Sequence, residues 1–342
     1  MTPQVVVYDP AATDELSKVR GVGRYLQILK ENFPDWTYTS DVSGLEKEAR
    51  AEIFINPFFN PLSSPPVTKK IAQKQLLVIH DLIPLKYPSH FPAGIRGKLN
   101  ILTNKKTLNL YDLIITDSEA SKGDIKEKFK IPETKIKVIY PCLPQIFTIK
   151  LKEQESPTYQ LPTTDYCIYV GDATWNKNLV NLAKAVKLAD TTCVFVGKVF
   201  GQINQLTKVE NLWQEELVEF FKLAKGDPRF VFPGFITDGE LIALYKNAQA
   251  NILVSRAEGF GFSYLEAASQ ETPSLLADIE VLHEISQDAA LFVDEQKPEM
   301  IAEKIKGLVS TDELRQTLGQ EAKERSRFFS AEKFRQDFLN LI

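Results

Sequence analysis

Two glutamates frame a short glycine-containing turn in the second half of the chain. The segment reads Glu258-Gly259-Phe260-Gly261-Phe262-Ser263-Tyr264-Leu265-Glu266 and directly follows an apolar run at 251–255. A helix that begins near Ser263 would aim its free N–H groups and positive dipole end at a diphosphate, and glycines would let the phosphates approach the backbone. Carboxylates only accept hydrogen bonds, so the two glutamates suit the hydroxyls of a hexose and a ribose. The segment therefore predicts a sugar-nucleotide site.

Most of these residues also have a purely structural explanation. Ser263 and Glu266 fit a capping box, in which the serine accepts from the third backbone N–H of the helix and the glutamate reaches back. Gly259 and Gly261 would permit a tight strand-to-helix turn. Glu258 has no such explanation, because it lies at the carboxyl end of a predicted strand, where open α/β sheets bind their ligands.

The first half of the chain has two candidate segments, one after a predicted strand and one before a predicted helix. His80 follows the apolar run 76–79, so we expect it at the carboxyl edge of a sheet; a hydrogen-bonded structural role is the alternative. Gly21 and Gly23 precede a helical stretch and would let backbone approach a phosphate or a sugar. A plain loop turn explains them equally well.

The second half repeats this arrangement after the predicted strand Tyr166–Val170. Gly171 and Asp172 end that strand, and Asn176 and Lys177 stand just before a helical pattern. A lysine at a strand-to-helix junction can neutralise a diphosphate. The alternative for Lys177 is an ordinary solvated lysine.

Short β-branched runs alternate with longer helical periods throughout, which is typical of βα units on a parallel sheet. The predicted strands are 5–8, 53–56, 76–80, 113–116 and 137–140, then 166–170, 193–197, 229–232, 251–254, 273–277 and 290–293. The predicted helices include 23–32, 96–110, 121–129, 178–187, 238–248 and 299–308. The sequence therefore predicts an α/β fold.

A chain of 342 residues is comfortable for two domains with separate cores. Residues 151–164 are polar, contain Pro157 and Pro162 and lack periodicity, so they read as a linker. We expect Rossmann-like domains at 1–150 and 165–328 that face each other across a cleft.

Composition limits the classes of partner and compartment. With 41 basic and 45 acidic residues, the net charge of −4 gives no electrostatic argument for nucleic acid. The three cysteines show no metal-ligand spacing, and an odd number argues against a disulfide framework, so we expect a reducing cytoplasm. No signal peptide is apparent, and no run reaches the ~20 apolar residues of a membrane span. The sequence predicts a soluble or peripheral protein.

Together these motifs resemble the retaining, GT-B-fold glycosyltransferases of family 4, over almost the whole chain. The resemblance is carried by the Gly21-Val22-Gly23-Arg24-Tyr25 loop, by His80-Asp81-Leu82-Ile83-Pro84-Leu85, by Thr116-Asp117-Ser118-Glu119-Ala120-Ser121, by Tyr169-Val170-Gly171 with Lys177-Asn178, and by the Glu258 to Glu266 pair, which looks like the E-x7-E signature of the family. Pro273 and Asp278 continue the pattern. The His-Asp-Leu-Ile-Pro-Leu run is similar to members that build O-antigen and other surface polysaccharides, often from GDP-mannose.

The resemblance implies a role for each candidate residue. Glu258 would contact the transferred sugar, Gly259, Phe260, Gly261 and Phe262 would offer backbone to sugar and phosphates, and Glu266 would bind the ribose. Lys177 would neutralise the diphosphate, with Gly171, Asp172, Asn176 and Ser263 around it. Gly21 and Gly23 would bring the acceptor-side domain up to the donor, and His80 would lie near the reacting sugar. Gly234, in the loop Pro233-Gly234-Phe235, would lie near the nucleotide base, and residues 329–342 would form a helix that crosses back to the first domain.

The sequence departs from the family at several of these positions. Many members carry an arginine directly after the glycine at 171 or directly before the lysine at 177, where this chain has Asp172 and Asn176. Arg24 or Arg20 from the first domain could substitute for this positive charge. Glu271 stands where a glycine is usual, and Ser263 stands where a proline is usual but remains a good N-cap residue.

The implied reaction moves a hexose, with mannose from GDP-mannose as the best match, to the hydroxyl of a glycan or lipid-linked acceptor in polysaccharide synthesis. Attack would come from the front face of the sugar with a donor phosphate oxygen taking the proton, so no protein nucleophile is assigned. No Asp-x-Asp occurs in the chain, so we expect no metal and no cofactor beyond the donor itself.

Other classes of function stay open on the sequence. A sugar-nucleotide 2-epimerase shares the fold but needs its own acid and base pair. An NAD-dependent oxidoreductase needs a third glycine after Gly21 and Gly23, which is absent. A non-catalytic nucleotide-sugar sensor or partner subunit is the closest rival, because of Asp172 and Asn176.

A basic amphipathic stretch in the first half suits peripheral contact with the inner face of a membrane. A solvated helix face is the alternative explanation. The stretch comprises Lys69, Lys70, Lys74, Arg96, Lys98, Lys105 and Lys106, interleaved with Leu99, Ile101, Leu102 and Leu108.

Overall fold

A computed structural model describes residues 4–9, 21–42, 51–149, 164–203, 209, 212–234 and 236–342. The chain divides into two compact units: Met1–Pro144 together with Phe329–Ile342, and Gln145–Phe328. The C-terminal segment thus groups with the first unit. Apart from residue 164, the predicted linker lies outside the described residues.

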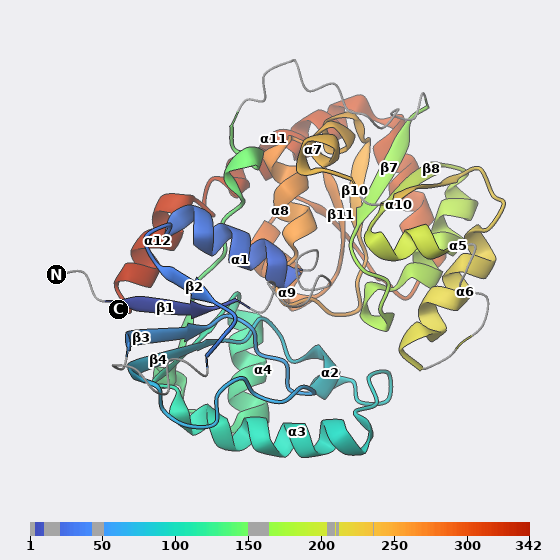
Figure 1. Cartoon of the computed structure of the whole chain (residues 1–342). Coiled ribbons are helices and arrows are strands. Elements are labelled where there is room, and N and C mark those ends of the chain that lie inside the picture. Colours follow the sequence, from blue (N-terminus) through green and yellow to red (C-terminus); the bar gives the residue numbers. More distant parts are fainter. Residues whose placement is uncertain are drawn as a thin grey trace. The chain divides into compact units, whose positions relative to one another are not determined.

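The first unit is a six-stranded parallel sheet of order β2-β1-β3-β4-β5-β6. Its helices lie on both faces, with α1 and α12 on one side and α3 and α4 on the other (Figure 1). The elements are β1 (Val5–Tyr8), α1 (Gly21–Asn32), β2 (Thr37–Thr39), β3 (Ala51–Asn56), β4 (Ala72–Val78), α2 (Ile83–Lys86), α3 (Gly94–Thr107), η3 (Leu108–Leu110), β5 (Leu113–Thr116), α4 (Glu119–Phe129), η4 (Glu133–Lys135), β6 (Ile136–Val138) and α12 (Ala331–Leu339).

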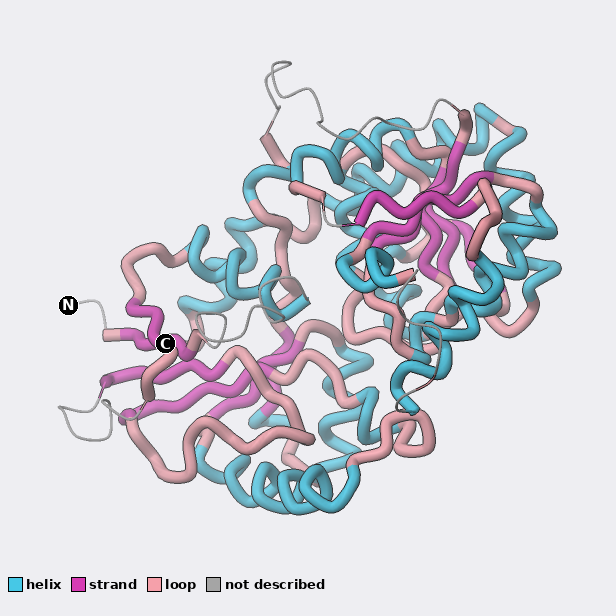
Figure 2. The backbone as a smooth tube through the Cα atoms, turned by 45° about the vertical axis from the view of Figure 1, so that its right-hand side comes forward, coloured by secondary structure: helices cyan, strands magenta, loops and turns pink. Residues whose placement is uncertain are grey.

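The second unit is another six-stranded parallel sheet, of order β12-β11-β10-β7-β8-β9. Figure 2 shows its strands (magenta) enclosed by helices (cyan). The elements are η5 (Gln145–Phe147), β7 (Tyr166–Val170), η6 (Trp175–Lys177), α5 (Leu179–Ala189), β8 (Thr192–Val196), η7 (Lys198–Gln202), η8 (Leu212–Gln214), α6 (Glu215–Ala224), β9 (Phe230–Gly234), α7 (Asp238–Asn247), β10 (Ala250–Leu253), α8 (Phe262–Ser269), β11 (Ser274–Ala277), α9 (Glu280–Ser286), β12 (Leu291–Val293), α10 (Pro298–Ser310) and α11 (Asp312–Ser326).

The central parts of most strands are apolar because helices cover both faces of each sheet. All four residues of β10 are buried, as are Leu76 to Val78 of β4. In the second unit α5 packs against α6 and α10, and α8 packs against α7 and α11. Each sheet thus holds the carboxyl ends of its strands in fixed register, which is what positions the candidate residues.

Each strand expected from the sequence is present, with its ends shifted by a few residues at most. The sequence pattern did not reveal β2, because a three-residue edge strand is too short to show a period. It also did not reveal α11, whose exposed face is strongly polar and whose buried residues, Leu318, Gly319 and Ala322, are few.

Candidate functional site

In the sheet of the second unit, the direction in which successive strands are added reverses between β7 and β10. β7 is its first strand; β8 and β9 add on one side of it, and β10, β11 and β12 add on the other. Open parallel sheets bind ligands outside the carboxyl ends of the strands at such a reversal. Residues 171–178 follow β7 and residues 254–261 follow β10. Both candidate segments of the second half therefore lie at this point.

Lys177 and Glu258 form an ion pair across the reversal. Nζ of Lys177 lies 2.7 Å from Oε1 and 2.8 Å from Oε2 of Glu258, and the hydroxyl of Ser255 donates to Oε1 at 2.7 Å. The carboxylate side chain is 9% exposed and the lysine side chain 20%. A carboxylate offers about four lone-pair sites, so these three contacts leave room for roughly one hydroxyl donor.

Asn176 ties the two loops together. Its Nδ2 donates to the carbonyl of Ala257 at 3.0 Å, and its Oδ1 accepts from the hydroxyl of Thr174 at 2.7 Å. Its own carbonyl accepts from the amide of Arg256 at 2.7 Å. The Asn176 side chain is buried. Its influence on a ligand therefore passes through the loop that carries Glu258.

Arg256 brings a positive charge into the same loop, although neither position 172 nor position 176 has an arginine. Its guanidinium lies 5.1 Å from the ring centroid of Trp175, donates to the carbonyl of Trp175, and lies 3.2 Å from Oε1 of Glu216. This charge is paired within the second unit. Its contacts with Trp175 and Glu216 therefore help to hold the η6 turn, which ends at Lys177.

Close packing explains the glycine that directly follows β7. A Cβ atom on Gly171 would lie 2.8 Å from the hydroxyl of Tyr169, and one on Gly197 would lie 2.3 Å from the carbonyl oxygen of Gly171. The same tyrosine hydroxyl donates to the carbonyl of Asp172 at 2.6 Å, and Oδ1 of Asp172 accepts from the amide of Ala173 at 2.9 Å. The turn is thus compact and held by its own hydrogen bonds.

The helix of the Glu258–Glu266 segment begins at Phe262, one residue before Ser263. Gly261 is the N-cap residue in the left-handed region, with φ of +107°, and no side chain caps the helix. The capping-box explanation is therefore wrong, and Ser263 is not the N-cap residue: the glycine adopts a conformation that serine avoids and starts the helix early. The amide of Tyr264 donates to the carbonyl of Gly261 at 3.0 Å, so the N–H groups of Phe262 and Ser263 are the ones that precede the first hydrogen bond of the helix. The rings of Phe260 and Phe262 pack 5.2 Å apart beside this end, where Gly259 is also buried.

Glu266 lies in the first turns of α8, and only 4% of the residue is exposed. Its Oε2 accepts a hydrogen bond of 3.1 Å from the hydroxyl of Tyr245 on α7. Gly234 ends β9 with φ of +77° and has nothing within 4 Å of a Cβ position. Phe235 lies outside the described residues. No contact links Gly234 to the Lys177–Glu258 pair among the residues described.

His80 follows β4 in the first unit and is held at both ring nitrogens. Nδ1 lies 2.6 Å from Oδ2 of Asp117, and Nε2 lies 3.1 Å from the carbonyl oxygen of Pro57. The ring of Tyr25 meets the imidazole edge-on at 4.7 Å. Both neighbours of the ring nitrogens are acceptors, so this arrangement favours the protonated imidazole, which can donate from both nitrogens. Burial lowers the pKa of His80, but Asp117, the Pro57 carbonyl and Asp81 outweigh it and raise the pKa above the ordinary value.

Gly21 and Gly23 form the first turn of α1, so the expected loop before a helix is instead the start of that helix. A Cβ atom on Gly21 would meet nothing within 4 Å. Arg24 in the same turn donates to the side chain of Gln27 at 3.1 Å. Arg20 lies outside the described residues. The helix that carries both glycines also carries the tyrosine that packs on His80.

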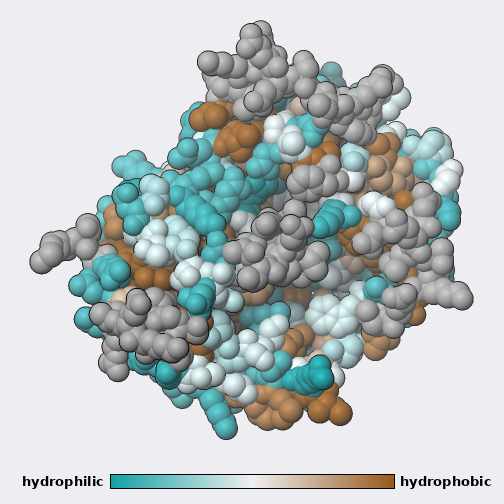
Figure 3. Space-filling view, viewed as in Figure 1, coloured by the Kyte–Doolittle hydropathy of each residue, from teal (hydrophilic) through white to brown (hydrophobic). Residues whose placement is uncertain are grey.

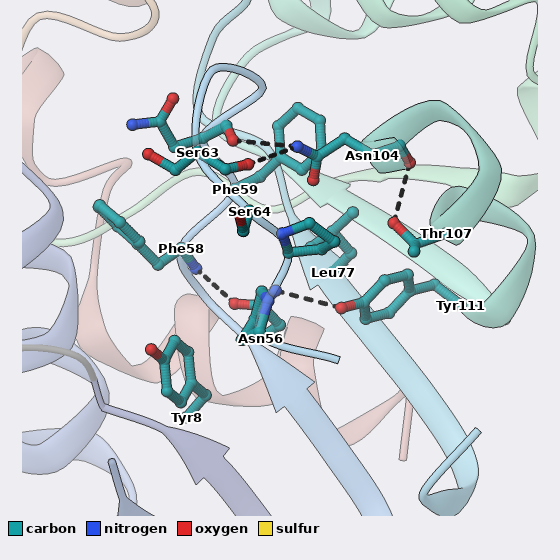
Figure 4. A pocket seen from close by; sticks show the side chains of 13 residues that line it. Tyr8, Asn56, Phe58, Phe59, Ser63, Ser64, Leu77, Asn104, Thr107 and Tyr111 are labelled. Carbon is teal, nitrogen blue, oxygen red and sulfur yellow. Dashed lines mark hydrogen bonds between the residues drawn. The ribbon is translucent and has the colours of Figure 1, made fainter. Parts of the chain in front are cut away.

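A cavity of about 170 Å³ lies in the first unit, where its sheet also reverses, between β1 and β3 (Figure 4). Tyr8 ends β1 and Asn56 ends β3, and Asn56 donates to the hydroxyl of Tyr111 at 3.1 Å. Two residues that line the cavity are hydrogen-bonded to each other: Asn104 of α3 donates to the carbonyl of Ser63 at 2.7 Å. The lining is neutral, with hydroxyl, amide and aromatic groups: Tyr8, Asn56, Phe58, Phe59, Asn60, Ser63, Ser64, Pro65, Pro66, Leu77, Asn104, Thr107 and Tyr111.

Three of these contacting residues were given no role at the site by the sequence. Ser255 follows the same strand as Glu258, and Asp117, quoted only as part of a family motif, follows the strand next to that of His80. Arg256 carried no sequence signal, because its partners Trp175 and Glu216 are distant in the chain.

Within the described ranges, no three histidine, cysteine, aspartate or glutamate side chains are grouped so that they would hold a metal ion. No described helix combines the length and the apolar character that crossing a membrane requires.

Comparison with known proteins identifies a family match and several relatives. The family model described as "Glycosyl transferases group 1" matches residues 152–325, just over half of the chain. The O-antigen chain mannosyltransferase RfbU of Salmonella typhimurium is 25% identical over 228 residues, which cover 66% of this chain but only 58% of that relative. The O-antigen chain mannosyltransferase B of Escherichia coli is 24% identical over 271 residues, covering 78% of this chain and 70% of that relative.

Solved structures match over the full length. A glycosyltransferase from Rickettsia africae has a TM-score of 0.67 at 17% identity, covering 100% of this chain and 98% of its own. Anabaena HepE, solved in complex with UDP and glucose, has a TM-score of 0.69 at 15% identity and 99% coverage of both chains. At these identities the matches concern the fold, and they confirm the predicted GT-B architecture of two Rossmann-like parallel-sheet domains.

Proposed function

Because this chain belongs to the group 1 glycosyltransferases, we propose that it is a retaining, metal-independent hexosyltransferase that uses a nucleotide-sugar donor and an acceptor hydroxyl. The observation that carries the proposal is the Lys177–Glu258–Ser255 cluster at the β7/β10 reversal, directly before the open N-terminus of α8. In this cluster the ammonium group of Lys177 can bind a diphosphate, and the neighbouring carboxylate of Glu258 can accept a hydrogen bond from a sugar hydroxyl.

The proposed reaction breaks the bond between the anomeric carbon and the diphosphate and forms a bond from that carbon to the acceptor oxygen on the same face. A phosphate oxygen of the departing diphosphate takes the acceptor proton. The transition state combines an oxocarbenium-like sugar with a developing dianion. Lys177 and the first N–H groups of α8 would stabilise the diphosphate, and Glu258 would orient the hexose. We place Glu266 at the ribose and keep His80 as a sugar-side candidate from the first unit.

The ion pair between Lys177 and Glu258 constrains this mechanism. Both Glu258 oxygens already contact Lys177. A diphosphate that draws the lysine away would therefore free carboxylate lone pairs for sugar hydroxyls. Donor binding and sugar orientation are thus coupled through one ion pair.

For the donor we propose GDP-mannose, because two relatives are named as O-antigen chain mannosyltransferases. For the acceptor we propose a glycan or lipid-linked glycan in surface-polysaccharide synthesis. The neutral cavity at the β1/β3 reversal supports this choice, since aromatic faces with amide and hydroxyl groups suit an uncharged sugar unit. A cytoplasmic location is part of the same proposal.

The test combines binding and turnover for the wild type, Glu258→Ala and Lys177→Gln, with Lys184→Gln as the matched control. Lys184 is an exposed lysine of the neighbouring helix α5. The ligands are GDP-mannose, UDP-glucose, UDP-N-acetylglucosamine, dTDP-rhamnose, GDP and NAD. We expect one sugar nucleotide to raise the melting temperature and to be slowly hydrolysed or transferred.

The two site variants should separate the roles of the pair. Lys177→Gln should weaken GDP binding by about ten- to a hundredfold, the effect of losing a charge-assisted hydrogen bond. Glu258→Ala should leave GDP binding unchanged or tighter, because it releases Lys177, but should reduce turnover by about 10²–10³. Binding without turnover for any donor would favour the sensor alternative, and a response to NAD alone would refute the transferase.

A further inference from the structure

Helix α3 presents apolar side chains to solvent along a single stripe. Ile95, Leu99 and Leu102 are 83%, 59% and 59% exposed, and their spacing of four and three residues places them on one face. Figure 3 shows apolar atoms gathered at the lower edge of the molecule, over α3. Single exposed apolar side chains are ordinary, but three in line on one helix form a patch that indicates a contact surface.

Basic side chains border this stripe. Lys98 and Lys105, seven residues apart, lie along one flank, Arg96 lies on the other, and Lys106 continues the line of the stripe. All four are exposed, and none forms an ion pair with any residue that the structure describes. The helix contains no acidic residue, although the chain as a whole carries a net charge of −4. The local charge is therefore opposite to that of the protein.

The opposite face of α3 packs on the rest of the first unit. Its residues Gly97, Asn104 and Thr107 are buried, and Asn104 donates to the carbonyl of Ser63. The apolar stripe thus faces away from the core of the first unit. Its 14 residues span about 21 Å, enough for the three apolar side chains to enter a surface together.

We propose that this face of α3 docks on an anionic lipid bilayer, with Ile95, Leu99 and Leu102 inserted below the headgroups and the four basic side chains at the phosphates. An apolar stripe with lysine and arginine at its borders is the arrangement that interfacial helices use. A second copy of the chain is the poorer occupant, because a two-fold contact would set the basic flanks of the two copies against each other. The proposal is independent of the donor chemistry.

The experiment is flotation of the full chain with vesicles rich in phosphatidylglycerol and with vesicles of phosphatidylcholine alone. We expect the wild type to float with the anionic vesicles, less so at high salt, and not with the neutral ones. The double variant Leu99→Gln/Leu102→Gln should lower partitioning by at least about tenfold. Lys98→Gln/Lys105→Gln should lower it as well and should flatten the salt dependence.

Matched controls come from the second unit. Leu188→Gln removes a leucine that is 49% exposed on α5, and Lys304→Gln removes an exposed lysine of α10; both should bind vesicles as the wild type does. The α3 variants should keep the wild-type melting temperature and donor turnover in solution. Absence of wild-type binding, or equal losses in the controls, would overturn the proposal. So would self-association of the wild type that the leucine variants abolish, since it would assign this face to a second copy.

Discussion

At the scale of single residues, both candidate sites set a basic side chain against a carboxylate at the ends of neighbouring strands. His80 meets Asp117 after β4 and β5, and Lys177 meets Glu258 after β7 and β10. In a parallel sheet these strand ends lie side by side, so such pairs form from residues far apart in sequence. Each pair keeps its charges satisfied until a ligand competes for one member.

The His80–Asp117 pair makes stability depend on pH. The pKa of His80 is raised in the folded protein, so the folded state binds its proton more tightly than the unfolded state does. This stabilisation is fully present below the unfolded pKa of about 6.5 and is lost as pH rises through the folded value. We therefore expect the wild type to exceed His80→Gln in unfolding free energy most at mildly acidic pH, with the difference shrinking above neutrality.

Urea denaturation at a series of pH values, followed by a signal from the first unit, measures this difference. Asp117→Asn should remove the same pH dependence, because it removes the charge that raises the histidine pKa. A difference between wild type and His80→Gln that stays constant across neutral pH would contradict the proposed pairing.

At the scale of elements, the end of α8 explains why glycine is usual at position 271. The amide of Glu271 donates to the carbonyl of Ala268 at 3.1 Å, and that of Thr272 donates to Ala267 at 3.0 Å. This is the Schellman pattern, whose closing residue is left-handed. Glu271 accordingly has φ of +63°, a conformation in which a side chain is strained. The Glu271 side chain itself is exposed.

Replacing this residue should stabilise the second unit. We expect Glu271→Gly to raise the unfolding free energy by about 0.5–1 kcal/mol, because glycine adopts positive φ without strain. The contrasting variant is Glu303→Gly, at an exposed position inside α10, which should lower it by about the same amount. Denaturant titration of the wild type and the two variants measures these changes in unfolding free energy. A loss of stability in Glu271→Gly would show that the glutamate side chain makes a stabilising contact.

At the scale of the whole molecule, the last helix belongs to the first compact unit although 184 residues of the second unit, Gln145–Phe328, precede it. Phe334 and Phe338 of α12 are buried, with their rings 6.2 Å and 5.7 Å from the ring of Phe33, which directly follows α1. The core of the first unit therefore closes only when the C-terminal segment is in place.

This closure predicts a selective loss of stability. Phe334→Ala should destabilise the first unit by about 3–5 kcal/mol, the usual cost of emptying a buried phenylalanine site, and should leave the second unit unchanged. Calorimetry should then show one transition moved to lower temperature and the other in place. Phe328→Ala is the matched control, since Phe328 is 42% exposed, and should move neither transition by a comparable amount. A uniform shift of both transitions would contradict the division into two units.

The sequence alone determined the features that depend on neighbours along the chain. The strand Tyr166–Val170, the turn that ends in Glu258 and the helix that carries Glu266 follow from local patterns of apolar, glycine and polar residues. The GT-B fold and the glycosyltransferase family followed from the same motifs, and both are confirmed. Local patterns placed the start of α8 one residue late, because Gly261 adopts a conformation that no periodicity reveals.

Only the tertiary structure decided which side chains meet. Lys177 and Glu258 are 81 residues apart, and His80 and Asp117 are 37 apart. Strand order brings each pair within 3 Å, and order in a sheet depends on packing of both faces, which the local pattern does not encode. The outward stripe on α3 is also tertiary, since a leucine such as Leu99 is identified as exposed only when the opposite face of its helix is seen to be buried.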